Sequence, residues 1–276
     1  MNILFSVIIY YSQYFFWANS MSILRNLFLT LFIATFAASP AWSAAKVPQF
    51  VTFDFYPFGQ KRAGKIIGLL PELMTEIEKL SGIKVAKSIE PIPRAIRSLL
   101  RGQKDLMITG ATSPAFRKTI SIGVIGCSRT NIVTNNKSNI SSLGKLSGKN
   151  IGFVSGGFLF KKFGSNFGIV PVQTSTSESM FRMLVRYRVD GIFISDIVFD
   201  SYRTEGAPFS KIPTDWLQRI GKIVEAEKIQ VHLRMSKTSK FQELVPRLNE
   251  AIKVGHAKGV FERIYRKYGS STGGRC

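Results

Sequence analysis

Apolar residues recur along this chain with two different periods, which predict strands and helices in turn. Short apolar runs bounded by turn residues indicate strands, and apolar residues three and four apart indicate helices. In the first half these patterns predict a strand at 51–56, a helix at 68–80, a strand at 83–89, a helix at 94–101 and a strand at 106–108. Gly82 and Gly102 follow the two helices, where a stop is expected. The alternation of strands and helices predicts an α/β sheet.

The alternation starts again after residue 146. The second half is predicted to hold strands at 151–154, 170–172 and 189–195, and helices at 177–186, 241–253 and 260–268. Ser177 is suited to cap the first of these helices. A second α/β unit is therefore expected over about 132–229, with no internal repeat.

The chain has 276 residues and a formal net charge of +21, which becomes 21 − 1 = +20 from residue 46 because Arg25 is the only charge in 1–45. Such a charge attracts anionic ligands, membrane headgroups or nucleic acid. No block of five or six like charges occurs, so no nucleic-acid partner is expected.

Cysteine and histidine are scarce: Cys127, Cys276, His232 and His256 are the only ones. A zinc site needs three or four such ligands in a cluster, so neither a metal nor another cofactor is expected. Cys127 has apolar neighbours and Cys276 is the last residue, which predicts a mobile end. On their own, the two cysteines say little about redox compartment.

The first 45 residues resemble an export signal. After Met21 come one basic residue, an apolar run over 27–38, Pro40 and small residues, which is the order of a secretory signal peptide. Cleavage is expected after Ser43 or Ala45, and Met21 is the expected true start. The alternative is a membrane anchor, although the apolar run is short for a span. The signal predicts a periplasmic protein.

Several motifs occur in a familiar order. They are Phe55-Tyr56-Pro57-Phe58 with Gly68-Leu69-Leu70-Pro71-Glu72-Leu73, Leu99 to Met107 (LLRGQKDLM), Gly110 with Thr112 and Arg117, Leu146 to Gly152 (LSGKNIG), Arg188-Val189-Asp190-Gly191, and Asn249 to Gly269. In this order and spacing the chain resembles family 3 periplasmic solute-binding proteins, the receptors of polar-amino-acid ABC importers.

The resemblance implies a type II periplasmic binding protein fold, with two α/β lobes joined by two hinge strands and the ligand in the cleft. Lobe 1 would comprise 46–131 and 230–276, and lobe 2 would comprise 132–229. The crossings would lie near 127–131 and 230–235. Hinge motion closes such clefts on a ligand. We expect a monomer that delivers a small solute to a membrane permease.

Arg117 is the leading candidate for ligand contact. It follows a buried strand and a small, polar stretch, and a guanidinium offers a carboxylate two parallel donors. Thr112 would add a hydroxyl, and Gly110 would let backbone approach the ligand. The alternative is a solvated loop arginine.

Other candidates surround the same cleft. Phe55 and Tyr56 would form an aromatic wall, with core packing as the alternative. Ser155 and Gly156 would offer backbone N–H groups to an anion where a helix begins, with a simple turn as the alternative.

One departure from the family concerns the expected partner of a ligand ammonium. The family places an aspartate five residues after the position of Asp190, where this chain has Ser195, and Asp196 comes one residue later. One residue along a strand reverses the side chain's face. Either a bulge returns Asp196 to the cleft, or the ligand lacks an α-ammonium.

Three functions fit these features. The first is a binding protein that captures an amino acid or another small carboxylate. The second is a dehydratase-like enzyme on the same fold, which would need a general acid or base; no Ser/His/Asp or Cys/His set occurs in the sequence. The third is an orphan sensory receptor.

Overall fold

The computed structural model describes residues 46–110, 114–155, 166–204 and 214–276. The predicted signal segment 1–45 lies outside these residues, as do Thr112 and Gly156. Residues Val47–Cys276 form one compact unit. Within the described ranges, no helix combines the length and the hydropathy that crossing a membrane requires.

The elements follow the predicted alternation. The strands are β1 (Gln49–Phe53), β2 (Gln60–Arg62), β3 (Lys65–Ile67), β4 (Ala86–Glu90), β5 (Leu106–Gly110), β6 (Thr119–Asn135), β7 (Asn150–Val154), β8 (Val170–Thr174), β9 (Gly191–Ser195) and β10 (Ile220–Ser236). The α-helices are α2 (Leu69–Ser81), α3 (Ile92–Leu100), α5 (Ser177–Val185), α6 (Asp196–Thr204), α7 (Val245–Ala257) and α8 (Val260–Lys267). The 3-10 helices are η1 (Pro114–Lys118), η2 (Leu143–Lys145), η3 (Trp216–Arg219) and η4 (Gln242–Leu244).

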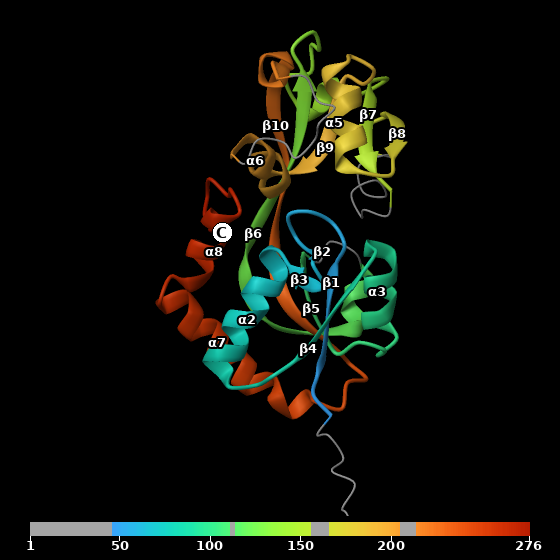
Figure 1. The fold of residues 1–276 in the computed structure, drawn as a ribbon. Coiled ribbons are helices and arrows are strands. Elements are labelled where there is room, and N and C mark those ends of the chain that lie inside the picture. The colour runs from blue at the N-terminus through green and yellow to red at the C-terminus, as the bar shows by residue number, and fades with distance from the viewer. Residues whose placement is uncertain (1–45, 111–113, 156–165, 205–213) are drawn as a thin grey trace, which may run out of the picture. The chain divides into compact units, whose positions relative to one another are not determined.

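Two long strands connect the halves of the main sheet, whose order is β4-β1-β5-β10-β6-β9-β7-β8 (Figure 1). β6 and β10 are antiparallel along their length, with Thr119 opposite Ser236 and Asn135 opposite Ile220. We call β4, β1 and β5 with α2, α3, α7 and α8 the first lobe, and β9, β7 and β8 with α5 and α6 the second lobe. Strands within each of these two groups are parallel. The predicted α/β fold with two connecting strands is confirmed; the lobe boundaries at 131 and 229 remain predictions.

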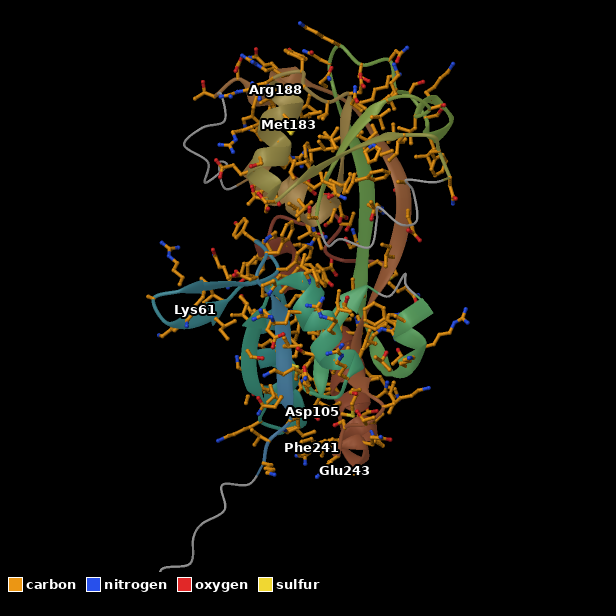
Figure 2. The ribbon with its side chains drawn as sticks, turned by 90° about the vertical axis from the view of Figure 1, so that its right-hand side faces the viewer. Lys61, Asp105, Met183, Arg188, Phe241 and Glu243 are labelled. Atoms are coloured by element: carbon orange, nitrogen blue, oxygen red, sulfur yellow. A yellow bond between two sulfur atoms is a disulfide. The ribbon has the colours of Figure 1, made fainter. Side chains whose placement is uncertain are left out.

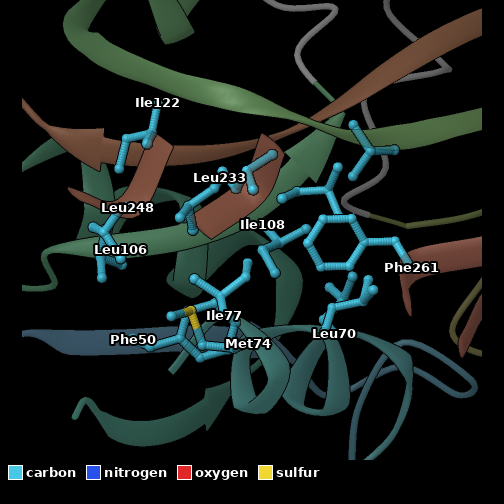
Figure 3. Close-up of a cluster of buried hydrophobic side chains, with 14 of the residues drawn as sticks. Phe50, Leu70, Met74, Ile77, Leu106, Ile108, Ile122, Leu233, Leu248 and Phe261 are labelled. Atoms are coloured by element: carbon cyan, nitrogen blue, oxygen red, sulfur yellow. The ribbon is translucent and has the colours of Figure 1, made fainter. Parts of the chain in front are cut away.

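The first lobe's core lies between the sheet and α2 (Figure 3). The helical spacing seen in the sequence places Leu73, Met74 and Ile77 on the buried face of α2, all fully buried. Burying one such side chain contributes about 1.5–3 kcal/mol. The helix ends at Gly82, whose left-handed φ of 67° suits glycine and whose N–H donates to the Glu78 carbonyl at 2.8 Å.

The second lobe has an aromatic core of its own. Phe181 of α5 contacts Trp216 edge to face at 5.7 Å between ring centroids and Tyr202 of α6 at 4.9 Å. Thr176, one residue before the predicted Ser177, caps α5 by accepting from the Ser179 N–H at 3.1 Å.

An aspartate joins the ends of two strands in each lobe. Asp105 (labelled in Figure 2) accepts from the Gln49 N–H at 2.8 Å and from the Ser239 hydroxyl at 2.7 Å. Asp190 accepts from the Asn150 N–H at 2.8 Å. These are the aspartates of the Lys-Asp-Leu and Val-Asp-Gly motifs, so both motifs act in the architecture of the sheet.

The carboxyl terminus is fixed, so the prediction of a mobile Cys276 is wrong. Cys276 forms a disulfide with Cys127 of β6, with 5.1 Å between the two Cα atoms. The Cys127 N–H also donates to the Gly274 carbonyl at 2.8 Å. The tail reaches the second lobe as well, because the Ser271 hydroxyl donates to Asp200 of α6 at 3.0 Å. The pairing could not be seen in the sequence, because the two cysteines are 149 positions apart.

Candidate functional site

A cavity of about 220 Å³ lies where strands of both lobes end. Phe53 and Gly110 stand at the carboxyl ends of β1 and β5, and Val154 and Ser195 stand at those of β7 and β9. Ligands of α/β sheets bind beyond these strand ends. The lining comprises Phe53, Phe55, Phe58, Leu70, Ile92, Ile108, Thr109, Gly110, Ser128, Thr130, Phe153, Val154, Met180, Phe193, Ile194, Ser195, Val198, Ile229 and Val231.

A tight loop after β1 carries the aromatic residues predicted to face the ligand. Phe55 and Gly59 exchange backbone hydrogen bonds of 3.0 and 3.1 Å across this loop. Phe55 lines the cavity and stacks on Phe58 at 6.1 Å. Tyr56 instead stacks on Tyr202 of the second lobe at 6.2 Å. The structure thus places Phe55 in the wall and Tyr56 beside it.

Gly110 lines the cavity, and its lack of a side chain has a packing reason in addition to the predicted one. A Cβ atom there would lie 2.8 Å from the Ile229 Cγ2 atom. Glycine therefore makes room for the Ile229 side chain, which itself lines the cavity. The absence of a side chain at Gly110 therefore shapes the wall, and the approach of its backbone to a ligand stays a prediction.

Arg117 lies on η1, shortly after residues 111–113, which include Thr112 and lie outside the described residues. Its side chain is exposed and is not among the residues that line the cavity. The preceding residue, Phe116, is buried in the first lobe under the Arg234 guanidinium, which lies 5.5 Å from the ring centroid. Phe116 anchors η1 and leaves Arg117 pointing away from the core. Its role as a carboxylate contact remains a prediction.

Ser195 lines the cavity, whereas Asp196 begins the next helix. β9 pairs with β6 in unbroken register from Gly191 opposite Thr134 to Ser195 opposite Thr130, so no bulge returns Asp196 to the wall. The Asp196 Oδ1 atom accepts from the Ile197 N–H at 2.8 Å, and from the Arg129 N–H and the Ser128 hydroxyl, both at 3.1 Å. Burial raises the pKa of Asp196, and these three hydrogen bonds oppose the rise.

The predicted anion site at Ser155 is partly occupied by the protein itself. The Ser155 N–H donates to the Thr174 carbonyl of β8 at 2.9 Å, so that donor is used within the sheet. Ser155 is exposed, and it comes directly after Val154, which lines the cavity. Gly156 and the predicted helix start lie outside the described residues.

The sequence analysis missed most of the wall. Fourteen of the lining residues have apolar side chains and four have hydroxyls: Thr109, Ser128, Thr130 and Ser195. Apolar residues in strands look alike whether they face a core or a cavity. The available signal was position, since several lining residues stand at the carboxyl ends of predicted strands.

The fold and the cavity define a two-lobed solute-binding protein of the type II periplasmic kind. The chain matches the bacterial extracellular solute-binding proteins of family 3 over residues 50–271, and it belongs to that family. The predicted solute-binding function is thereby confirmed at the level of the family.

Individual relatives are distant. The arginine-binding extracellular protein ArtP of Bacillus subtilis (strain 168) is 24% identical over 220 residues, which cover 78% of this chain and 82% of that protein. An ancestral arginine-binding protein bound to arginine shares the fold with a TM-score of 0.64 at 23% identity, covering 80% of this chain and 97% of that one. A substrate-binding protein of a Streptococcus pneumoniae ABC uptake transporter, with bound histidine, has a TM-score of 0.65 at 20% identity, covering 82% and 94%.

Proposed function

We propose that this protein captures a small carboxylate-bearing solute, with an amino acid as the leading class, and delivers it to an ABC importer. One observation carries the proposal: the cavity at the strand ends is built from both lobes, and β6 and β10 connect them. Ligand binding in such a site favours closure of the lobes. The names of the relatives, which include arginine-binding and histidine-bound proteins, support an amino acid.

Arg117 is proposed to contact the solute carboxylate. Its side chain is exposed and forms no hydrogen bond or ion pair with another described residue. It follows β5, whose last residue lines the cavity. Closure of the lobes around a solute would bring the Arg117 guanidinium into contact with the solute carboxylate. A planar guanidinium gives two parallel hydrogen bonds that lysine cannot reproduce.

Titration calorimetry with variants of Arg117 tests this role. Hydrogen bonds to a charged group are worth about 1.5–3 kcal/mol, so Arg117→Ala is expected to weaken binding of a carboxylate solute about 10- to 100-fold. Arg117→Lys is expected to recover only part of the loss. Arg97→Ala, which removes an exposed arginine from α3 of the same lobe, is the matched control. Unchanged affinity in Arg117→Ala would remove Arg117 from the site.

The proposal places the protein in the periplasm as a monomer. The disulfide supports an oxidising compartment, where such bonds persist. Fractionation of cells that express the chain, followed by thiol labelling, tests this location. Recovery of the protein in the cytoplasm with both thiols labelled would contradict it.

A sensory role is the alternative that one comparison favours. A histidine kinase sensor domain with similarity to periplasmic binding proteins shares the fold with a TM-score of 0.66 at 17% identity. Uptake of labelled solute by cells with and without the gene separates the roles, since loss of uptake supports delivery.

An enzymatic role predicts that the protein converts its solute, which chromatography of the solute after incubation would reveal.

A further inference from the structure

The cavity has an apolar wall on both sides. The first lobe contributes Phe55 and Phe58, which stack on one another, and the second lobe contributes Phe153 and Phe193. The second pair is almost fully buried, with 3% of each side chain exposed. Aromatic faces contribute large apolar areas, and ring pairs favour stacked or edge-to-face contact with a further ring.

The polar groups of the wall are uncharged. Thr109, Ser128, Thr130 and Ser195 bring hydroxyls to the cavity, and among the described lining residues there is no aspartate, glutamate, lysine or arginine. Hydroxyls both donate and accept, so they can satisfy a ligand's polar groups without offering a counter-charge. A charged side chain buried in such a wall would lose its hydration without a partner.

The carboxylate that follows Ser195 of the wall is already committed. Three donors converge on the Asp196 Oδ1 atom, two of them backbone N–H groups that hold the start of α6 and the strand β6 in place. Asp196 is only 8% exposed, and the wall at this point is made by Ser195. A basic ligand side chain would therefore find a serine hydroxyl where a carboxylate would be needed.

The cavity has room for a ligand of amino-acid size. Its volume of about 220 Å³ corresponds to about seven water molecules at about 30 Å³ each. That is below the range of about 300–1,000 Å³ found for pockets that hold drug-sized ligands. A solute of amino-acid size fits this room better than a peptide or a sugar chain.

We propose that the cleft selects a solute with an uncharged apolar body, of which phenylalanine is the type, and rejects arginine, lysine and glutamate. The inference deepens the proposed function and rests on it. Its ground is the combination of phenylalanines contributed by both lobes, uncharged hydroxyls and an occupied Asp196. The arginine-binding relatives share the fold, but the wall described here suits a different side chain.

Calorimetric titration of the purified protein with a matched series of solutes tests the inference. The series comprises phenylalanine, arginine, glutamate, 3-phenylpropanoate, which lacks the ammonium, and 3-phenylpropanamide, which lacks the charged carboxylate as well. Phenylalanine or 3-phenylpropanoate is expected to bind at least tenfold more tightly than arginine and glutamate. In the series alanine, norvaline and norleucine, each buried methylene is expected to tighten binding about fourfold.

The outcomes separate this inference from the function beneath it. Arginine or glutamate binding as tightly as phenylalanine overturns the apolar selection and leaves the carboxylate receptor standing. Equal binding of 3-phenylpropanamide and 3-phenylpropanoate supports the apolar selection and overturns carboxylate recognition. Failure of every solute to bind overturns both.

A variant that places a carboxylate in the wall gives a second test. Ile92 is a partly buried lining residue at the start of α3, where an acidic residue suits the helix dipole, so Ile92→Asp is compatible with folding. It is expected to lower the ratio of phenylalanine to arginine affinity at least tenfold. Val245→Asp is the matched control, because α7 also begins with an apolar residue followed by Pro-Arg and Val245 does not line the cavity. An equal change of the ratio in both variants would overturn the proposal.

Removing an aromatic wall residue completes the test. Phe55 is half-buried, so Phe55→Ala is expected to weaken phenylalanine binding at least tenfold while circular dichroism shows an intact fold. Phe241→Ala, at a half-buried phenylalanine outside the cavity (Figure 2), is the control and is expected to leave the affinity unchanged. Unchanged phenylalanine affinity in Phe55→Ala would contradict an aromatic wall at the ligand.

Discussion

Breaking the disulfide between Cys127 and Cys276 is expected to destabilise the protein strongly. The bond closes a loop between two cysteines that are 149 positions apart in the sequence. In the chain-entropy relation, a loop of this length removes about 17 cal/mol/K from the unfolded chain, or about 5 kcal/mol at 25 °C. For a domain of this size, that corresponds to a fall in the melting temperature of about 10–20 °C.

Thermal unfolding of wild-type protein and Cys276→Ser, each with and without a reductant, measures this effect. The wild type is expected to lose stability on reduction and to approach the variant. The variant is expected to melt at the same temperature in both conditions, which controls for other effects of the reductant. Equal melting of oxidised wild type and variant would refute the reasoning, since it would mean that the bond does not form or does not restrict the unfolded chain.

Three further predictions concern single side chains. Asp105→Ala removes two hydrogen bonds to a carboxylate and is expected to lower the free energy of unfolding, measured by denaturant titration, by about 2–4 kcal/mol. Glu243→Ala, at an exposed position, is the control and is expected to change it by less than about 0.5 kcal/mol. Similar losses in both variants would contradict the role of Asp105. Leu233→Ala, at a fully buried position (Figure 3), is expected to lower the free energy of unfolding by about 2–5 kcal/mol. Leu217→Ala, at a position that is 47% exposed, is expected to change it very little. Equal losses in the two variants would contradict the assignment of Leu233 to the core. Burial raises the pKa of Asp196, so the native state binds the carboxyl proton more tightly than the unfolded chain does. The wild type is therefore expected to lose stability relative to Asp196→Asn as the pH rises from about 4 through the raised pKa. Parallel plots of unfolding free energy against pH for the two proteins would contradict this.

Sequence periodicity predicted most of the helices but missed α6 (Asp196–Thr204), and it did less well with the long strands. The helix predicted at 68–80 is α2 (Leu69–Ser81), because its apolar face follows the helical period and a glycine ends it. The hairpin of β2 and β3 was missed, since its residues are mostly exposed and polar. The full length of β6 and β10 was also missed, because each strand crosses from one lobe to the other and changes its burial pattern on the way.

The candidate site shows a different limit of the sequence. The family resemblance predicted Phe55 and Gly110 near the ligand, and both line the cavity. Whether Ser195 or Asp196 would line it depended on whether β9 contains a bulge, which only the register with β6 shows. The apolar wall could not be recognised at all, because a phenylalanine that faces a cavity has the same sequence signature as one in a core.

A crystal structure of the protein with the tightest-binding solute of the phenylalanine series tests the central claim most directly. The account predicts the ligand's ring against Phe55, beyond the carboxyl ends of β1 and β9, and its carboxylate on the Arg117 guanidinium. A ligand bound outside this cavity, or one whose carboxylate contacts other groups while Arg117 stays in solvent, would contradict it.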